Sequence, residues 1–265
     1  MGWFARHSEF YDFARGAEHW RYTTDAAAVV YASQTYAPQP GMKRSAIVLT
    51  QELEKAALQI TVPWDFPLLE IYRPTPPSQR VSVTVYRLAK GATTATIAWQ
   101  GVVTDIDDPD EHSSTLNCAG GMAMLTAQGL IRNWQKACPL ALYGVGRGQC
   151  NKDPESVRTN ATVTGGSGTT LQAAEFASQS DGWFTGGFIR WQVGLATELR
   201  FIVSHVGDTL GLLTPATIPV GTAVATYPGC DHTVLGGCTK LANTDNYGGQ
   251  LYIPDKNPMG GDPIF

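Results

Sequence analysis

Four cysteines lie in two pairs in the C-terminal half of the chain, Cys138 with Cys150 and Cys230 with Cys238. Eleven residues separate the first pair and seven separate the second, and both intervals contain glycines. Glycine permits the sharp, left-handed turns that bring distant cysteines onto one centre. The pattern therefore predicts that the four thiolates bind one metal ion or cluster, in a structural role.

The residue types alone leave the identity of the metal open. Thiolate sulfur suits both tetrahedral zinc and an iron-sulfur cluster, although the CxxC pairs of small zinc modules are absent, which favours the cluster. Uncoordinated thiols or disulfides are further alternatives. His232 lies inside the second pair, where an imidazole can replace one thiolate; we favour a supporting hydrogen bond or a plain turn role. Because four protein ligands leave no open position for substrate, we expect no catalysis at this centre.

A thiol enzyme is the main catalytic alternative. Cys138 with His205 or His232 would supply a thiol and an imidazole. However, Pro139 directly follows the cysteine, and no helix start bearing a nucleophile follows a strand. We therefore expect that the chain is not an enzyme. The fifth cysteine, Cys118, stands among small and apolar residues and is predicted to be a core residue.

Two other patterns invite a functional interpretation. The run Asp105–Glu111 resembles a calcium loop, but Asp110 and Leu116 occupy the positions where such a loop needs glycine and glutamate, so we expect a solvated acidic turn.

The aromatic residues Trp183, Phe184, Trp191 and Tyr252 would suit a receptor-binding or carbohydrate-binding module. A buried β core or a subunit interface requires the same residue types.

The elements that must position these residues are predicted to be mainly β, with minor α content. Alternating apolar residues and turn signals predict the strands. The expected elements are a hairpin around Gly16 in residues 9–36, strands at 43–50, 58–62, 81–86, 96–103, 186–193, 198–205 and 218–227, and short helices at 52–55, 129–137 and 171–176. The prolines from Pro63 to Pro77 predict a connection that is not helical, and Gly165–Thr170 predicts a turn or loop. Leu199, Phe201 and Val203 are expected to share one strand face.

Composition bounds the class of protein. With 265 residues and 43% apolar content, the chain is long enough for one large or two ordinary domains. We place a boundary at residue 130, between a β-barrel or sandwich domain (1–130) and a loop-rich domain that carries the cysteines (131–265).

The net charge of −4 and the scattered basic residues argue against specific nucleic-acid binding. The chain shows no signal peptide or membrane-spanning run, so we expect a soluble protein made in the cytoplasm. Low charge and many aromatic residues favour assembly with partners.

The chain resembles the hub proteins of the tail tip or baseplate of long-tailed phages and phage-like gene transfer agents, related in their C-terminal part to the lambda-type tail tip protein L. The cysteine segments and the Asn-Tyr-Gly-Gly tail carry the likeness most specifically. The matching stretches are Trp20–Thr23, Tyr36, Lys43–Ser45, Ala137–Gly144 with Cys150, Asp181–Gly187, His205–Asp208, Pro228–Thr233, Cys238, Asn243, Asn246–Gly249 and Ile253–Pro254. The loop 144–149 is longer than in the compact family pattern.

The resemblance implies a structural virion protein, a homo-oligomer of trimeric form at the distal end of the tail tube, assembled in the bacterial host cytoplasm. Its partners would be the distal tail protein, the tape measure protein and the central tip or receptor-binding protein. In the lambda-like relatives the C-terminal cysteines bind a [4Fe-4S] cluster. Carried over to this chain, the ligands would be Cys138, Cys150, Cys230 and Cys238.

Overall fold

The computed structural model describes residues 7–48, 57–73, 75–121 and 133–254. By its internal contacts the chain divides into two compact units. The first contains residues 1–128 and 192–198, and the second contains residues 129–191 and 199–265. The predicted boundary at residue 130 lies outside the described residues. Within the described residues, no helix is long and apolar enough to cross a membrane.

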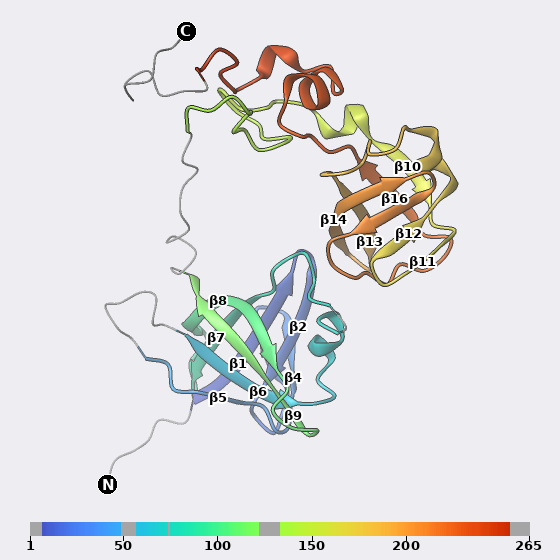
Figure 1. The fold of residues 1–265 in the computed structure, drawn as a ribbon. Helices are drawn as coiled ribbons and strands as arrows, with labels where there is room; N and C mark the ends of the chain where they lie inside the picture. Colours follow the sequence, from blue (N-terminus) through green and yellow to red (C-terminus); the bar gives the residue numbers. More distant parts are fainter. Residues whose placement is uncertain (1–6, 49–56, 74, 122–132, 255–265) are drawn as a thin grey trace. The chain divides into compact units, whose positions relative to one another are not determined.

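The first unit is built on one nine-stranded, almost entirely antiparallel sheet, with the strand order β3-β4-β2-β1-β7-β8-β9-β6-β5. Figure 1 shows this sheet curving into a half-barrel. Its strands are β1 (His7–Arg15), β2 (Glu18–Thr23), β3 (Val29–Tyr31), β4 (Gln34–Pro38), β5 (Lys43–Arg44), β6 (Leu58–Pro63), β7 (Ser82–Ala89), β8 (Thr96–Asp107) and β9 (Ser113–Gly120). The single parallel pair, among the pairings of the described residues, joins β2 to β4.

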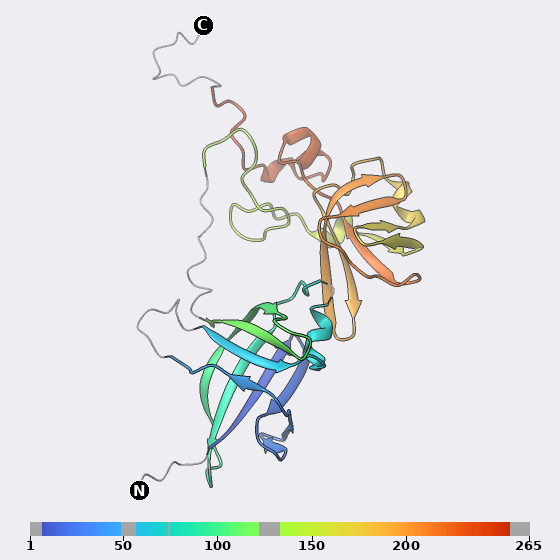
Figure 2. The ribbon, with the colours of Figure 1, turned by 60° about the horizontal axis from the view of Figure 1, so that its bottom comes forward.

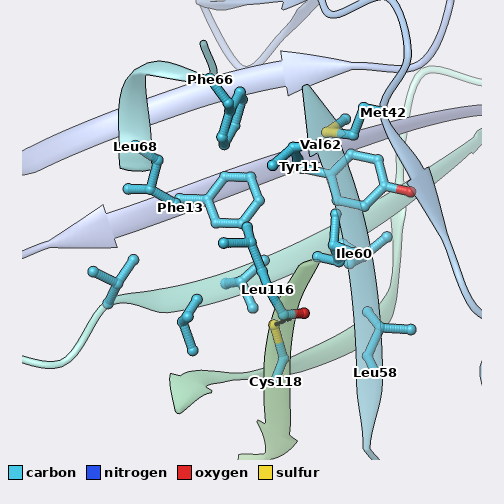
Figure 3. Packing of buried hydrophobic residues seen from close by; sticks show 14 of the residues in the cluster. Tyr11, Phe13, Met42, Leu58, Ile60, Val62, Phe66, Leu68, Leu116 and Cys118 are labelled. Carbon is cyan, nitrogen blue, oxygen red and sulfur yellow. Dashed lines mark hydrogen bonds between the residues drawn. The ribbon is translucent and has the colours of Figure 1, made fainter. Parts of the chain in front are cut away.

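Alternation in the sequence explains the core of this unit. Along β7 the side chains of Val83 and Val85 are fully buried, because every second residue of a strand points to the same face. Figure 3 shows the resulting cluster, in which aromatic rings from β1 meet aliphatic side chains from β6 and β9. Cys118 is a member of this cluster and is 2% exposed, so its predicted core role is confirmed.

The second unit contains a seven-stranded sheet with the order β10-β16-β13-β14-β15-β12-β11. Figure 2 shows these strands from a second direction, again curving around a common interior. The strands are β10 (Thr159–Thr162), β11 (Gly165–Ser167), β12 (Thr170–Gln172), β13 (Phe188–Val193), β14 (Ala196–Val206), β15 (Thr209–Leu212) and β16 (Ala223–Tyr227). The short helices of the second unit are η4 (Pro154–Val157), η5 (Ala174–Ser178), η6 (Val234–Thr239) and η7 (Thr244–Asn246). The prediction of a mainly β fold is confirmed.

Several local predictions are confirmed. The hairpin around Gly16 forms β1 and β2, with Gly16 at φ 61°, a left-handed conformation that suits glycine. The strands predicted at 58–62, 81–86 and 96–103 correspond to β6, β7 and β8, and β7 pairs with β8. Leu199, Phe201 and Val203 do share one face of β14, and that face is exposed to solvent, while Arg200 and Ile202 face inward.

Other local predictions are wrong. The proline-rich connection contains a short 3₁₀ helix, η2 (Pro67–Ile71), because proline at a first helical position needs no hydrogen-bond partner for its nitrogen. The turn predicted within Gly165–Thr170 is present, but it joins β11 and β12 as a hairpin, and neither strand was expected. The helix expected at 171–176 is displaced, since β12 occupies Thr170–Gln172 and the 3₁₀ helix η5 follows it. β9 was not expected as a strand.

Two further predictions concern short segments. The strand expected at 43–50 is reduced to β5 (Lys43–Arg44) within the described residues, and the helix expected at 52–55 lies outside them. The described part of the helix expected at 129–137 is irregular. The acidic run Asp105–Glu111 splits between the end of β8 and an exposed turn, in which Asp110 accepts hydrogen bonds from the backbone N–H groups of His112 and Ser113.

Candidate metal centre

The two cysteine pairs come from two irregular segments of the second unit. All four cysteines are free thiols. Cys138 and Cys150 pack together with Leu140, and Tyr247 lies against them. In the second segment, Thr233 begins the short helix η6 by accepting a hydrogen bond from the N–H of Gly236 at 3.0 Å, and this helix carries Cys238. Local capping therefore fixes the segment from Cys230 to Cys238.

The long loop between Cys138 and Cys150 is folded around one asparagine. The side chain of Asn151 accepts from the N–H of Gly146 at 2.8 Å and donates to the carbonyl oxygen of Gly146 at 2.9 Å. The N–H of Asn151 donates to the carbonyl oxygen of Gly144 at 2.7 Å. These bonds close the loop and return the chain to Cys150. Sequence reasoning missed Asn151, although asparagine in a glycine-rich segment is a recognised turn signal.

Hydrogen bonds join the two cysteine segments to each other. The N–H of Cys138 donates to the carbonyl oxygen of His232 at 2.8 Å, and Nδ1 of His232 lies 2.9 Å from the carbonyl oxygen of Cys138. Asn243 makes a second link, because its Nδ2 donates to the carbonyl oxygen of Cys150 at 2.8 Å while its N–H donates to that of Cys238 at 2.8 Å. The fold thus ties the first pair to the second at two places.

Three of the four sulfur atoms accept hydrogen bonds from N–H groups. The backbone N–H of Gly248 lies 3.4 Å from Sγ of Cys138, and the backbone N–H of His232 lies 3.3 Å from Sγ of Cys230. The side-chain Nδ2 of Asn243 lies 3.4 Å from Sγ of Cys150. Such donors stabilise negative charge on sulfur. Asn243 and the Asn-Tyr-Gly-Gly segment are among the stretches that carry the family resemblance. In the structure, Asn243 and Gly248 of that segment each donate a hydrogen bond to a cysteine sulfur.

The four sulfur atoms are close enough to influence one another electrostatically. Burial, together with negative charge on Cys230, Cys138 and Cys150, raises the pKa of Cys238 to about 11. Burial likewise raises the pKa of Cys230; the N–H of His232 opposes this, and Asp231 and two of the other cysteines add to it. The thiols of Cys230 and Cys238 therefore stay protonated at neutral pH unless a cation compensates their charge.

The backbone around the cysteines is held in unusual conformations. Of the six non-glycine residues with positive φ among the described residues, four adjoin this site, namely Tyr143, Asn151, His232 and Ala242. Residues in the left-handed region persist only where surrounding contacts hold them. Gly237 shows the same crowding, since a Cβ atom there would lie 2.5 Å from Sγ of Cys230. The second segment needs glycine at this position to pass so close to the sulfur.

The positions of the cysteines and histidines can be compared with a single-ion metal site and with a thiol–imidazole pair. Among the described residues, no group of three or more His, Cys, Asp or Glu side chains is arranged around a point that would hold a single metal ion. His232 faces a carbonyl oxygen, which only accepts, so its Nδ1 carries the hydrogen. His205 is buried, and its Nε2 lies 3.0 Å from the carbonyl oxygen of Gly207 and 3.2 Å from that of Phe176. Neither imidazole makes a hydrogen bond to a cysteine sulfur in the part of the chain that the structure describes.

The aromatic residues considered for carbohydrate binding do not form one surface. Phe184 is fully buried and Trp191 is 5% exposed, so both belong to the core of the second unit. Trp183 packs partly against that core, and Tyr252 is 96% exposed. The four residues therefore serve different purposes.

Comparisons with known proteins find a phage protein family and a protein of a gene transfer agent virion. A family model described as "Phage conserved hypothetical protein BR0599" matches residues 182–257, a stretch that contains Cys230 and Cys238. No curated protein gives a significant match. Among solved structures, a chain in the virion of a native gene transfer agent particle has a TM-score of 0.79 and 17% sequence identity, with 99% of this chain and 93% of that chain covered. At this identity the likeness shows a shared fold over the whole chain.

Proposed function

We propose that this chain is a structural virion protein of a tailed phage or phage-like particle, and that it forms the hub of the tail tip or baseplate. The observation that carries the proposal is the shared fold along 99% of the chain with a protein of a gene transfer agent virion. The phage family model over residues 182–257 supports it independently. The hub would be a homo-oligomer, in trimeric form, that joins the tail tube to the tip and contacts the distal tail, tape measure and central tip proteins.

The surface of the second unit supports an assembled state. Phe201 and Val203 on β14 are 48% and 44% exposed, and Leu213, whose N–H donates to the carbonyl oxygen of Phe201, is 62% exposed. Contiguous apolar surface of this kind is unusual on a free monomer. Assembly into a larger particle would remove it from water.

The location can be tested directly. Particles would be purified from a producing strain and labelled with an antibody against the chain, and labels at the distal end of the tail would support the proposal. Particles from a strain that lacks the gene should have defective tail tips, and the wild-type gene supplied in trans should restore them. Labels on the capsid, or intact infectious particles without the protein, would overturn it.

We further propose that Cys138, Cys150, Cys230 and Cys238 hold a [4Fe-4S] cluster in a structural role. The donor set fits, because it offers four thiols without disulfides and three N–H···S hydrogen bonds of the kind that stabilise ligating sulfur. In such a cluster each thiolate binds a different iron, so the ligands need not converge on one point as the ligands of a zinc ion do. The bound group would supply positive charge and four covalent links between loops that lack a core of their own.

The protein's own residues prepare this site before any metal binds. His232 and Asn243 fix the two segments relative to each other, and the N–H groups of His232, Gly248 and the Asn243 side chain favour the deprotonated sulfur. Each ligating thiol must lose its proton, so metal binding opposes the raised pKa of Cys230 and Cys238. The proposed role is therefore to stabilise the fold rather than to catalyse a reaction.

Anaerobic purification tests the metal. The full chain is compared with Cys138→Ser and Cys230→Ser, with Cys118→Ser as the matched control, and iron, zinc and acid-labile sulfide are measured with the visible spectrum. We expect about four iron per chain in the wild type and control, and a bleached spectrum in both ligand variants. One zinc per chain would keep the four-cysteine site and change its metal. Metal-free protein would overturn the site and return attention to disulfides or to a thiol enzyme.

A further inference from the structure

Cys230 differs from the other three cysteines of the candidate centre in its access to solvent. Cys138, Cys150 and Cys238 are 8%, 9% and 6% exposed. Cys230 alone among the four is only partly buried. Reagents attack a thiol only where they reach the sulfur, so this difference separates one ligand from three.

Cys230 lies in the lining of a cleft of about 550 Å³ in the second unit. One wall is the loop that precedes β13, and the other is the second cysteine segment with the end of η6. The lining residues are Ser180, Asp181, Gly182, Trp183, Thr185, Gly186, Cys230, Asp231, Gly236 and Lys240. Glycines and short side chains dominate this lining, which leaves room for a small molecule in the cleft.

Hydrogen bonds tie the two walls of the cleft to each other and to β14. Nζ of Lys240 donates to the carbonyl oxygen of Trp183 at 2.6 Å and to that of Gly229 at 2.9 Å, and its ammonium lies 5.0 Å from the centre of the Trp183 ring. The N–H groups of Gly182 and Gly186 donate to carbonyl oxygens of β14 at 2.9 Å each. The cleft is thus a fixed feature of the fold, with a cation at its edge.

Backbone packs closely against the sulfur of Cys230. Gly237 approaches so closely that an added Cβ would lie 2.5 Å from Sγ of Cys230, and the N–H of His232 donates to the same sulfur. Little room is left on the side of the sulfur that faces Gly237.

We propose that this cleft is the port through which small thiols and chelators reach the four-cysteine centre, and that Cys230 is the ligand that exchanges first. The inference rests on the proposed metal centre. In the exchange, an incoming low-molecular-weight thiol loses its proton and takes the coordination position of Cys230. Sγ of Cys230 takes up a proton in return, and no electron is transferred. Lys240 at the edge of the cleft favours an anionic incoming thiolate over a cationic one.

Thiol labelling of the full chain tests the order of access without requiring metal. Metal-free, reduced protein is treated with N-ethylmaleimide for increasing times, and each cysteine is quantified by peptide mass spectrometry. We expect Cys230 to react on the order of tenfold faster than Cys138, Cys150 or Cys238, because access governs the rate. Equal rates, or faster labelling of any of the other three, would overturn the proposal.

A variant that narrows the cleft tests the route in the metal-loaded chain. Thr185→Trp places a large side chain on the cleft lining, whereas Thr214→Trp adds the same bulk at an exposed position outside it. We expect Thr185→Trp, but not Thr214→Trp, to slow both the labelling of Cys230 and the glutathione-assisted release of iron to a chelator several-fold. Unchanged rates in a folded Thr185→Trp variant would show that the cleft is not the route.

The two proposals fail in different ways. If purified protein contains no metal under anaerobic conditions, the cluster is overturned and with it the port. The labelling order still reports whether Cys230 is the accessible thiol. If the metal is present but Cys230 is not the fastest thiol, the cluster stands and the port alone is overturned. Should Thr185→Trp fail to fold, the labelling order in the unmodified chain remains decisive.

Discussion

His232 and Cys138 are linked by two hydrogen bonds, although their positions differ by 94 in the sequence. The N–H of Cys138 donates to the carbonyl oxygen of His232 at 2.8 Å, and Nδ1 of His232 donates to the carbonyl oxygen of Cys138 at 2.9 Å. The imidazole therefore braces one cysteine segment against the other, and it does so from a left-handed backbone conformation with φ 62°.

This link predicts that replacing His232 loosens the centre without removing a ligand. His232→Gly tolerates the left-handed backbone and deletes the Nδ1 bond, which contributes about 1 kcal/mol. We expect the variant to bind metal at the wild-type ratio and to release it to a chelator several-fold faster. Complete loss of metal with an altered spectrum of any residual centre would instead indicate that the imidazole is a ligand. His19→Gly is unsuitable as a control because it lies in a strand, so His112→Gly in the exposed β8–β9 turn serves that purpose.

Gly237→Ala is expected to disrupt the second cysteine segment. Its Cβ would lie 2.5 Å from Sγ of Cys230 and 3.1 Å from a carboxylate oxygen of Asp231, so the sulfur must move. We expect the variant to lose most of its bound metal when measured by iron and zinc analysis. Gly121→Ala is the matched control, because its Cβ meets nothing closer than 3.8 Å. Full metal content in Gly237→Ala would show that metal binding does not require the present position of the Cys230 sulfur.

Cys118→Ala should leave the metal centre unaffected. The thiol is buried in the core of the first unit, and burial raises its pKa to about 12, so it stays protonated and unreactive at neutral pH. Removing the sulfur atom costs about 1–2 kcal/mol of unfolding free energy through the small cavity that remains. Chemical denaturation would measure this change, and metal analysis should give the wild-type content. Loss of metal would place Cys118 at the centre after all.

The stability of the first unit should depend on an ion pair around Glu9. Burial acts to raise the pKa of Glu9, but hydrogen bonds from Arg44 and Arg87, at 2.6 Å and 2.8 Å, outweigh it and lower the pKa to about 2. Because the pKa is lower in the folded state than the ordinary value of 4.5, the stabilisation is fully present above pH 4.5 and is lost as the pH falls toward 2.

Glu9→Gln tests this dependence. We expect the variant to lower the free energy of unfolding by about 2–3 kcal/mol at pH 7, since the carboxylate loses its charged hydrogen bonds, and to differ little from the wild type near pH 2. Denaturation monitored at several pH values would show the two curves converging. Glu111→Gln, at an exposed turn, should change neither value. Curves that stay parallel down to pH 2 would show that the charge of Glu9 is not the source of the effect.

The sequence by itself determined the mainly β class, the hairpin at Gly16 and the alternating core of β7, because strand periodicity and turn chemistry are local properties. It also selected the four cysteines, since their residue type and glycine-rich spacing are visible without a structure. It did not predict the short helix η2 or the strands β11 and β12, because such short segments take their conformation from the sheet around them.

Only the tertiary structure decided how the site is held together and which sulfur faces solvent. The contacts of Asn151, Asn243 and His232 join residues that are distant in the sequence or depend on left-handed backbone that no pattern reveals. Cys230 is partly exposed and lines the cleft beside the loop before β13, whereas the other three cysteines are buried by packing between segments. Burial and cross-segment contacts depend on how distant elements pack, so spacing along the chain could not give them.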